Sequence, residues 1–167
     1  MRPSHGTSCY AETFMHICDI FVGLGDDGFP QLLRSVSMGK LKTYQLYDRL
    51  KTRAHLAKLN SENLRKAAPR LLDRLRDTDE DLAMDLSQAI LISHLDLIQA
   101  VLNFLGIPHE EGFFAKDLDA SKYLTEGWEQ RAYDNFKDAY PAALVHFYIN
   151  HLALEMLKAE NLFVPAA

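Results

Sequence analysis

Cysteine is scarce in this 167-residue chain, and that scarcity is a first constraint on its function. Only Cys9 and Cys18 are present, too few for the disulfide framework of a small secreted domain. Their spacing also matches no zinc-binding signature. We therefore expect a reducing compartment, and the predicted location is cytoplasmic.

Long uninterrupted apolar runs are also missing. The apolar segment 13–24 contains Asp19, follows Glu12, and lacks the basic flank and small-residue cleavage site of a signal peptide. The other apolar segment, 86–107, is interrupted by polar side chains that a bilayer rejects, namely Gln88, His94, Asp96, Gln99 and Asn103. The sequence therefore predicts no membrane span and no membrane partner.

Catalytic and cofactor motifs are absent as well. The chain contains no nucleophile elbow, P-loop, zinc-protease helix or kinase signature, and no haem or iron–sulfur pattern. Residues 23–28 (GLGDDG) spell a dinucleotide fingerprint after an apolar stretch. However, two aspartates occupy the loop that would approach phosphate, and the downstream sequence is helical where a βαβ unit is required. We expect no cofactor, and enzymatic activity stays open.

What the chain does have is the composition of one globular domain, with 48% apolar and 25% charged residues. From residue 40 onward, apolar residues recur at helical spacing, which predicts an all-α bundle domain over 40–167. Region 1–39 holds five of the eight glycines. It predicts a looser N-terminal appendage, with a helix over 8–22, a turn at 25–28 and a short helix opened by Pro30.

Five main helices are predicted in the bundle, over 40–58, 61–77, 79–105, 121–139 and 141–159. Pro69 predicts a kink at Ala68 in the second. The third begins with an acidic turn, ends at Gly106 and is apolar over half its circumference, so we expect a long central helix. The last is apolar on nearly every side, which requires burial in the core or cover by a second subunit.

Charge is divided unevenly between the two parts of the bundle. Residues 40–76 carry a net charge of +8, whereas 77–167 carry −11. A basic helical pair is compatible with phosphate contact. A basic helical pair that packs beside acidic helices is also ordinary charge complementarity within a bundle. Neither an aromatic platform nor a recognition-helix motif for nucleic acid accompanies the basic pair. The sequence therefore disfavours a nucleic-acid partner.

The loop 109–119 combines four acidic residues with a histidine and two adjacent aromatic residues. Its order of oxygen ligands does not follow that of a calcium loop. We expect Phe113 and Phe114 to fasten the loop to the bundle, and Asp119 or Ser121 to cap the next helix.

The most informative polar residue is His94, which falls in the middle of the apolar half of the predicted central helix, on the stripe of Ser87. A buried imidazole needs a hydrogen-bond partner, because burial removes its hydration. It is either a satisfied core residue, with Tyr44, Tyr47 or Tyr148 as partner, or a ligand-binding and proton-transfer group.

A second polar group lies on the last helix, where His151 and Glu155 are four residues apart and share a face. Such a pair is usually an ion pair, although a histidine and a carboxylate at this spacing can share a metal. Glu12 and His16 have the same spacing. Since no Glu-x-x-His pair of the di-metal bundles is present, we expect no metal.

Two functional hypotheses follow from these patterns. The leading one is a non-catalytic module that binds another protein or itself, for example as a homodimer, because the last helix is apolar all round and the charge is bipolar. The alternative is a small-molecule- or metal-binding bundle with a pocket near His94. The candidate pocket residues are His94, Ser87, Tyr148, His151 and Glu155.

Overall fold

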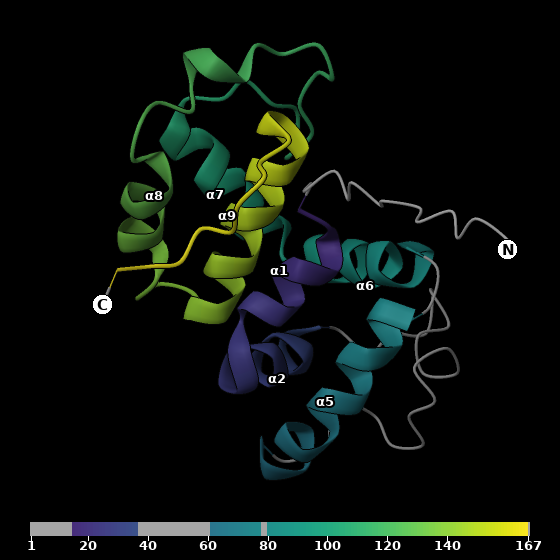
Figure 1. Cartoon of the computed structure of the whole chain (residues 1–167). Coiled ribbons are helices and arrows are strands. Elements are labelled where there is room, and N and C mark those ends of the chain that lie inside the picture. Colours follow the sequence, from purple (N-terminus) through teal and green to yellow (C-terminus); the bar gives the residue numbers. More distant parts are fainter. Residues whose placement is uncertain (1–14, 37–60, 78–79, 167) are drawn as a thin grey trace, which may run out of the picture.

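The computed structural model describes residues 15–36, 61–77 and 80–166 (Figure 1). Over these residues the chain is helical and forms no named strand, which confirms the predicted all-α fold class. The elements are α1 (Ile17–Gly23), α2 (Gly25–Ser35), α5 (Ser61–Asp77), α6 (Glu80–Ser93), α7 (Leu95–Leu105), the 3₁₀ helix η2 (Ala120–Lys122), α8 (Trp128–Phe136) and α9 (Ala142–Leu157). The predicted helix over 40–58 lies outside the described residues.

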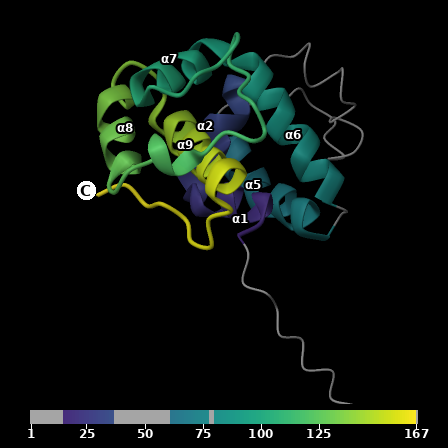
Figure 2. The same ribbon diagram turned by 90° about the horizontal axis from the view of Figure 1, so that it is seen from above.

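The core is organised around α9, which contacts α1, α2 and α8 (Figures 1 and 2). Nine residues of α9 are buried, on all sides of the helix: Ala143, Leu144, Val145, Phe147, Tyr148, Ile149, Asn150, Leu152 and Ala153. A helix that is apolar all round gains about 0.8 kcal/mol per buried methylene only if neighbours cover each face. Here helices of the same chain cover them, so burial in the core accounts for the pattern.

Residues 15–36 are part of this core, which corrects the prediction of a looser appendage. The side chains of Phe21, Phe29 and Leu33 are fully buried. The Phe21 ring stacks on Phe147 of α9 at 5.3 Å and meets the edge of Phe29 at 5.8 Å. The sequence predicted a helix over 8–22, whose described part overlaps α1, and a short helix from Pro30, which overlaps α2. Both are too short to show a sustained helical period, so the pattern did not reveal that they belong to the core.

The predicted glycine turn at 25–28 is in fact the first turn of α2. Gly25 has φ +74°, the left-handed conformation that lets the chain change direction directly after α1. Gly28 lies close to α9, where an added Cβ would be 3.6 Å from Ala143 Cβ. Pro30 therefore lies inside α2 and does not open a helix.

The predicted long central helix over 79–105 is wrong, because the chain bends by 81° between α6 and α7. The break is at His94, whose φ of −133° and ψ of 43° are not helical. Just before it, the Ser93 hydroxyl donates to the Ala89 carbonyl at 2.7 Å, a contact that weakens and bends helices. Apolar spacing is similar on both sides of the bend, so it could not reveal the break. The predicted end at Gly106 is confirmed, with φ +73°.

Within the described ranges, no single helix is both long and apolar enough to cross a bilayer. The bent pair of α6 and α7 meets the length and composition together. Core helices of ordinary folded proteins meet the same criteria, and Leu86, Ile90 and Leu97 of this pair are buried in the core.

The predicted helix over 121–139 is shorter than expected, because α8 begins only at Trp128. Before it, Asp119 caps η2 as predicted, since its Oδ1 accepts from the Ser121 backbone N–H at 3.2 Å and from its hydroxyl at 2.6 Å. Phe114 packs against the core. Phe113 does not fasten the loop, because 71% of it is exposed.

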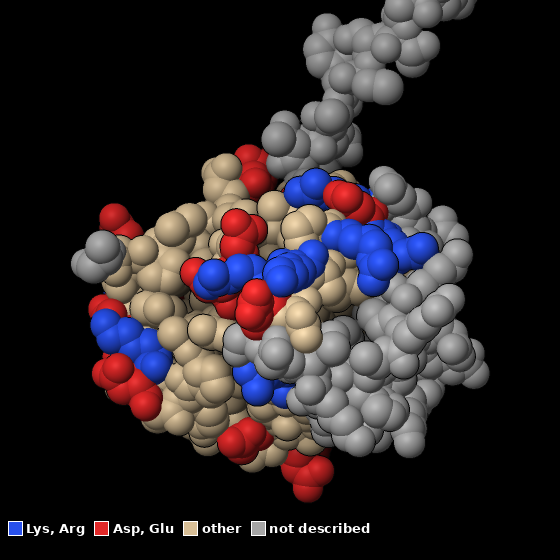
Figure 3. All heavy atoms as spheres, turned by 90° about the horizontal axis from the view of Figure 1, so that it is seen from below, with Lys and Arg blue, Asp and Glu red and all other residues tan. Residues whose placement is uncertain are grey.

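The α5 helix has the predicted bounds, with Pro69 inside it; the kink stays a prediction. Its basic side chains lie among acidic ones (Figure 3). Arg65 pairs with Asp27 of α2, and Lys66 Nζ lies 3.0 Å from Glu62 Oε1. The described part of the predicted basic region therefore presents mixed charge.

Candidate functional site: a cleft between α1, α5, α6 and α9

A cleft of about 680 Å³ lies between four helices that are distant in sequence. This volume falls within the range of small-molecule sites, roughly 300–1,000 Å³. Its walls are formed by Met15, His16, Ile17, Cys18 and Asp19 at the start of α1, Leu75 and Arg76 of α5, Met84 and Gln88 of α6, and His151, Leu154 and Glu155 of α9.

The apolar walls of the cleft include side chains of α1 and α5, and a hydrogen bond joins these two helices beside the cleft. Met15 and Leu75 are buried, and the Cys18 thiol donates to the Leu75 carbonyl oxygen at 3.0 Å, which ties α1 to the last turn of α5. Met84 is 51% exposed, so it belongs to the mouth of the cleft. Methionine side chains are flexible and polarisable, which suits a wall that adapts to a ligand.

The polar feature of the cleft is His151, whose side chain is only 12% exposed. Its Nδ1 is fully buried and has no hydrogen-bond partner among the described residues, and Glu155 Oε2 lies 3.7 Å from it. Burial lowers the pKa of His151 to about 4, so the ring is neutral at pH 7. The expected ion pair between His151 and Glu155 is therefore a contact between a neutral imidazole and a carboxylate.

Glu155 differs from His151 in exposure, since 54% of its side chain is open to solvent. Partial burial nevertheless raises its pKa above the ordinary value. Tyr148 is buried in α9; burial and, secondarily, the charge of Glu155 raise its pKa, so its hydroxyl stays protonated. Asp19 and Arg76 add one charge of each sign to the cleft.

His94 is not in this cleft, and its place is structural. Its Nε2 lies 3.1 Å from the hydroxyl of Ser35 at the end of α2, and that hydroxyl donates to the Leu32 carbonyl at 2.6 Å. The Ser35 oxygen must therefore accept a hydrogen bond from the Nε2–H of His94. Burial lowers the pKa of His94, and the negative charge of nearby Asp96 acts in the opposite direction with a smaller effect. The partner is Ser35, whereas tyrosine was expected; Tyr44 and Tyr47 lie outside the described residues.

The five predicted pocket residues thus do not converge. His151 and Glu155 line the cleft, whereas His94, Ser87 and Tyr148 do not. Ser87 is buried in α6, and its hydroxyl has no partner among the described residues.

Sequence reasoning missed the apolar lining, including Met15, Leu75 and Met84. These residues follow the same apolar spacing as core residues, so no signal in the sequence separates them from the core. The sequence predicts residues 1–39 as a looser appendage because of their glycines, and for that reason it does not predict that the start of α1 lines the cleft.

Among the described residues, no three histidine, cysteine or acidic side chains are grouped so that they could hold a metal ion. His16 does line the same cleft as His151 and Glu155, whereas Glu12 lies outside the described ranges. Comparison of the chain with protein-family models, curated proteins and solved structures found no match.

Proposed function

We propose that this protein binds an uncharged, mostly apolar small molecule in the cleft between α1, α5, α6 and α9. The observation that carries the proposal is the neutral imidazole of His151 in the wall of an apolar cleft of ligand size, with a buried Nδ1 that has no hydrogen-bond partner in the part of the chain that the structure describes. The alternative predicted from sequence, a ligand-binding bundle, is retained, and its pocket moves from His94 to His151.

The ligand is uncharged because the cleft holds no buried charge that could compensate an ion. The charged side chains that line it, Asp19, Arg76 and Glu155, are exposed to solvent and sum to a net charge of −1, and the buried His151 is neutral at pH 7. A charged ligand loses hydration on entering an apolar cleft, and without a partner of opposite charge that loss is not recovered. An apolar body meets the thioether and aliphatic side chains of Met15, Met84 and Leu154.

One polar group on the ligand would complete the hydrogen bonding of the site. A buried acceptor left unpaired costs roughly 1–3 kcal/mol. Nδ1 of His151 is buried without a partner among the described residues, and in the tautomer with the proton on Nε2 it is such an acceptor. Glu155 lies beside it, and its exposed side chain is free of tight packing, so it has room to turn away. A ligand hydroxyl that reaches Nδ1 would then supply the missing donor.

A titration with the neutral fluorescent probe N-phenyl-1-naphthylamine tests the proposal. We expect saturable binding with a Kd near 1 μM, about −8 kcal/mol. Met84→Lys places an ammonium group in the mouth at an exposed position, and should weaken binding at least tenfold. Leu157→Lys is the matched control, because Leu157 is a similarly exposed apolar residue that does not line the cleft. Absence of saturation, or equal loss in both variants, would contradict the proposal.

The charge of the ligand is tested with 8-anilinonaphthalene-1-sulfonate, an anionic probe of similar ring size. The wild-type protein should bind it at least tenfold more weakly than the neutral probe. Tighter binding of the anion, lost again in Met84→Glu, would show that the ligand class is wrong while the cleft is right.

Self-association, the leading hypothesis from the sequence, stays a prediction. Its support in the sequence is the all-round apolar helix α9 together with the bipolar charge, and helices of the same chain bury α9. A different feature now bears on it, the segment that follows α9.

A further inference from the structure

The segment 158–166 leaves the end of α9 and runs back past α8 (Figures 1 and 2). It contains no helix or strand of its own. It contacts residues of α1, α8 and α9, chiefly Gly23, Gln130, Tyr133, His146 and Asn150. We call this set of residues the tail groove.

The backbone of the tail is recognised by Asn150, a buried polar residue with 1% exposure. Its Oδ1 accepts from the Phe163 N–H at 2.7 Å, and its Nδ2 donates to the Phe163 carbonyl at 3.1 Å. Nε2 of His146 donates to the same carbonyl oxygen at 2.8 Å. The Asn150 side-chain amide thus pairs with both backbone groups of Phe163, much as the main chain of a sheet edge pairs with an added peptide strand.

Side chains of the tail fill two neighbouring positions. The centroid of the Phe163 ring lies 6.2 Å from that of the Tyr133 ring and 6.0 Å from that of the His146 ring, and both pairs are T-shaped. Leu162 lies over Gly23, where an added Cβ would be 2.9 Å from Leu162 Cδ1. Val164, which follows Phe163 in the segment, is 73% exposed and fills no such position.

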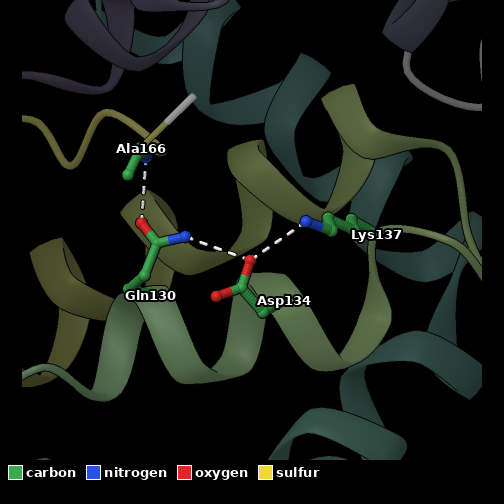
Figure 4. Close-up of polar contacts among 4 residues, drawn as sticks. All are labelled: Gln130, Asp134, Lys137 and Ala166. Atoms are coloured by element: carbon green, nitrogen blue, oxygen red, sulfur yellow. Dashed lines mark hydrogen bonds and ion pairs between the residues drawn. The ribbon is translucent and has the colours of Figure 1, made fainter.

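The far end of the tail is held by a polar chain along α8 (Figure 4). Gln130 Oε1 accepts from the Ala166 N–H at 3.0 Å. The amide of Gln130 donates to Asp134 at 3.1 Å, and Lys137 Nζ donates to the same carboxylate oxygen at 3.1 Å. Gln130 is therefore oriented to receive a backbone N–H.

We propose that the tail groove is a site for an extended peptide segment, and that the segment 158–166 of a second copy of this chain occupies it when two copies exchange tails. Every contact described above joins the tail to helices and none requires that both belong to one chain. An exchanged pair therefore keeps all of them, which makes such exchange a low-cost route to dimers.

The hinge for this exchange is Lys158. It has φ +50°, a left-handed conformation that is strained in a residue other than glycine. It is the turn by which the tail folds back on its own α9. The tail in cis has an effective concentration in the millimolar range, so the closed monomer prevails in dilute protein and exchange rises with concentration.

The first experiment measures peptide binding to the full-length chain by fluorescence anisotropy. The probe is a fluorescein-labelled peptide with the sequence of residues 159–167. Phe163→Ala weakens the tail in cis and should bind this peptide at least tenfold more tightly than wild type. The double variant Phe163→Ala, Asn150→Ala should lose that binding. Equal binding to wild type and Phe163→Ala, or none to either, would overturn the proposal.

The second experiment changes only the exposed hinge, so that folding of the helices is not at issue. Proline cannot adopt φ +50°, so Lys158→Pro should form dimers at about 1 mM, as measured by light scattering. Lys158→Gly relieves the strain and should contain at least fivefold less dimer than Lys158→Pro. A monomeric Lys158→Pro would overturn the second copy as the occupant. A Lys158→Pro dimer that persists after Asn150→Ala would show association elsewhere, and would overturn the proposal as well.

Discussion

The acid sensitivity of this fold is expected to depend strongly on His151. Its pKa is lowered from 6.5 to about 4 in the folded protein, because burial disfavours the charged ring. As the pH falls, the unfolded chain therefore takes up a proton before the folded one does. The stabilisation is fully present above pH 6.5 and is lost progressively between pH 6.5 and 4.

The size of this effect follows from the shift. One pKa unit corresponds to about 1.4 kcal/mol, so the whole shift corresponds to about 3.4 kcal/mol and the loss by pH 5 to about 2 kcal/mol. The other charged or titratable groups that line the same cleft are His16, Asp19, Arg76 and Glu155. Glu155 Oε2 lies 3.7 Å from Nδ1 of His151, and any stabilisation of the protonated ring by its carboxylate would reduce the loss.

The variant His151→Leu removes both the titrating ring and the unpaired Nδ1. At pH 7.5 it should be at least as stable as wild type, with a gain of about 1 kcal/mol from removing an unsatisfied buried atom. Between pH 7.5 and 5.0 it should lose about 2 kcal/mol less than wild type. His94 and His146, whose pKa values are also lowered by burial, are present in both proteins, so their contribution cancels.

The assay is urea unfolding followed by circular dichroism at both pH values. Leu154→Ala is the control, because it alters the same cleft without removing a titratable group; its loss of stability should be equal at the two pH values. The reasoning is refuted if His151→Leu and wild type show the same pH dependence. An NMR titration in which the His151 ring has a midpoint above pH 6 would refute it equally.

Three further predictions concern urea unfolding at pH 7. Phe21→Ala removes a ring stacked on Phe147 and should cost about 3–5 kcal/mol; a loss under 1 kcal/mol would contradict the place of α1 in the core. Ser35→Ala removes the partner of His94 and should cost about 1 kcal/mol, and no loss would show that their contact does not support the bend. Ser87→Ala removes a buried hydroxyl without a described partner, so stability should stay the same or rise by about 1 kcal/mol; a clear loss would reveal a partner.

Some features of the fold were predictable because they depend on neighbours along the chain. The bounds of α5 and the start of α9 after Pro141 follow from capping residues and apolar spacing within about twenty residues. The end of α7 at Gly106 follows from the need for a left-handed residue there.

Other features depend on contacts between distant segments, and the sequence pattern did not contain them. The bend at His94 is supported by Ser35, which is fifty-nine residues earlier. Of the predicted pocket residues, His151 and Glu155 line a cleft, and the other walls of that cleft are formed by α1, α5 and α6. Asn150 is a polar residue whose partner cannot be read from its neighbours in sequence, and in the structure it is buried and pairs with Phe163 of the tail.

By itself, the sequence determined that the chain is all-α, where α5 and α7 end, where α9 begins, and that α9 must be covered on every side. It could do so because helical periodicity and capping are local properties of the backbone. Only the tertiary structure decided what covers α9, that the apolar stretch over 79–105 is two helices, and that a neutral histidine lines a cleft. The physical reason is that burial, and with it the pKa of His151, depends on side chains brought together from four helices rather than on any residue near it in sequence.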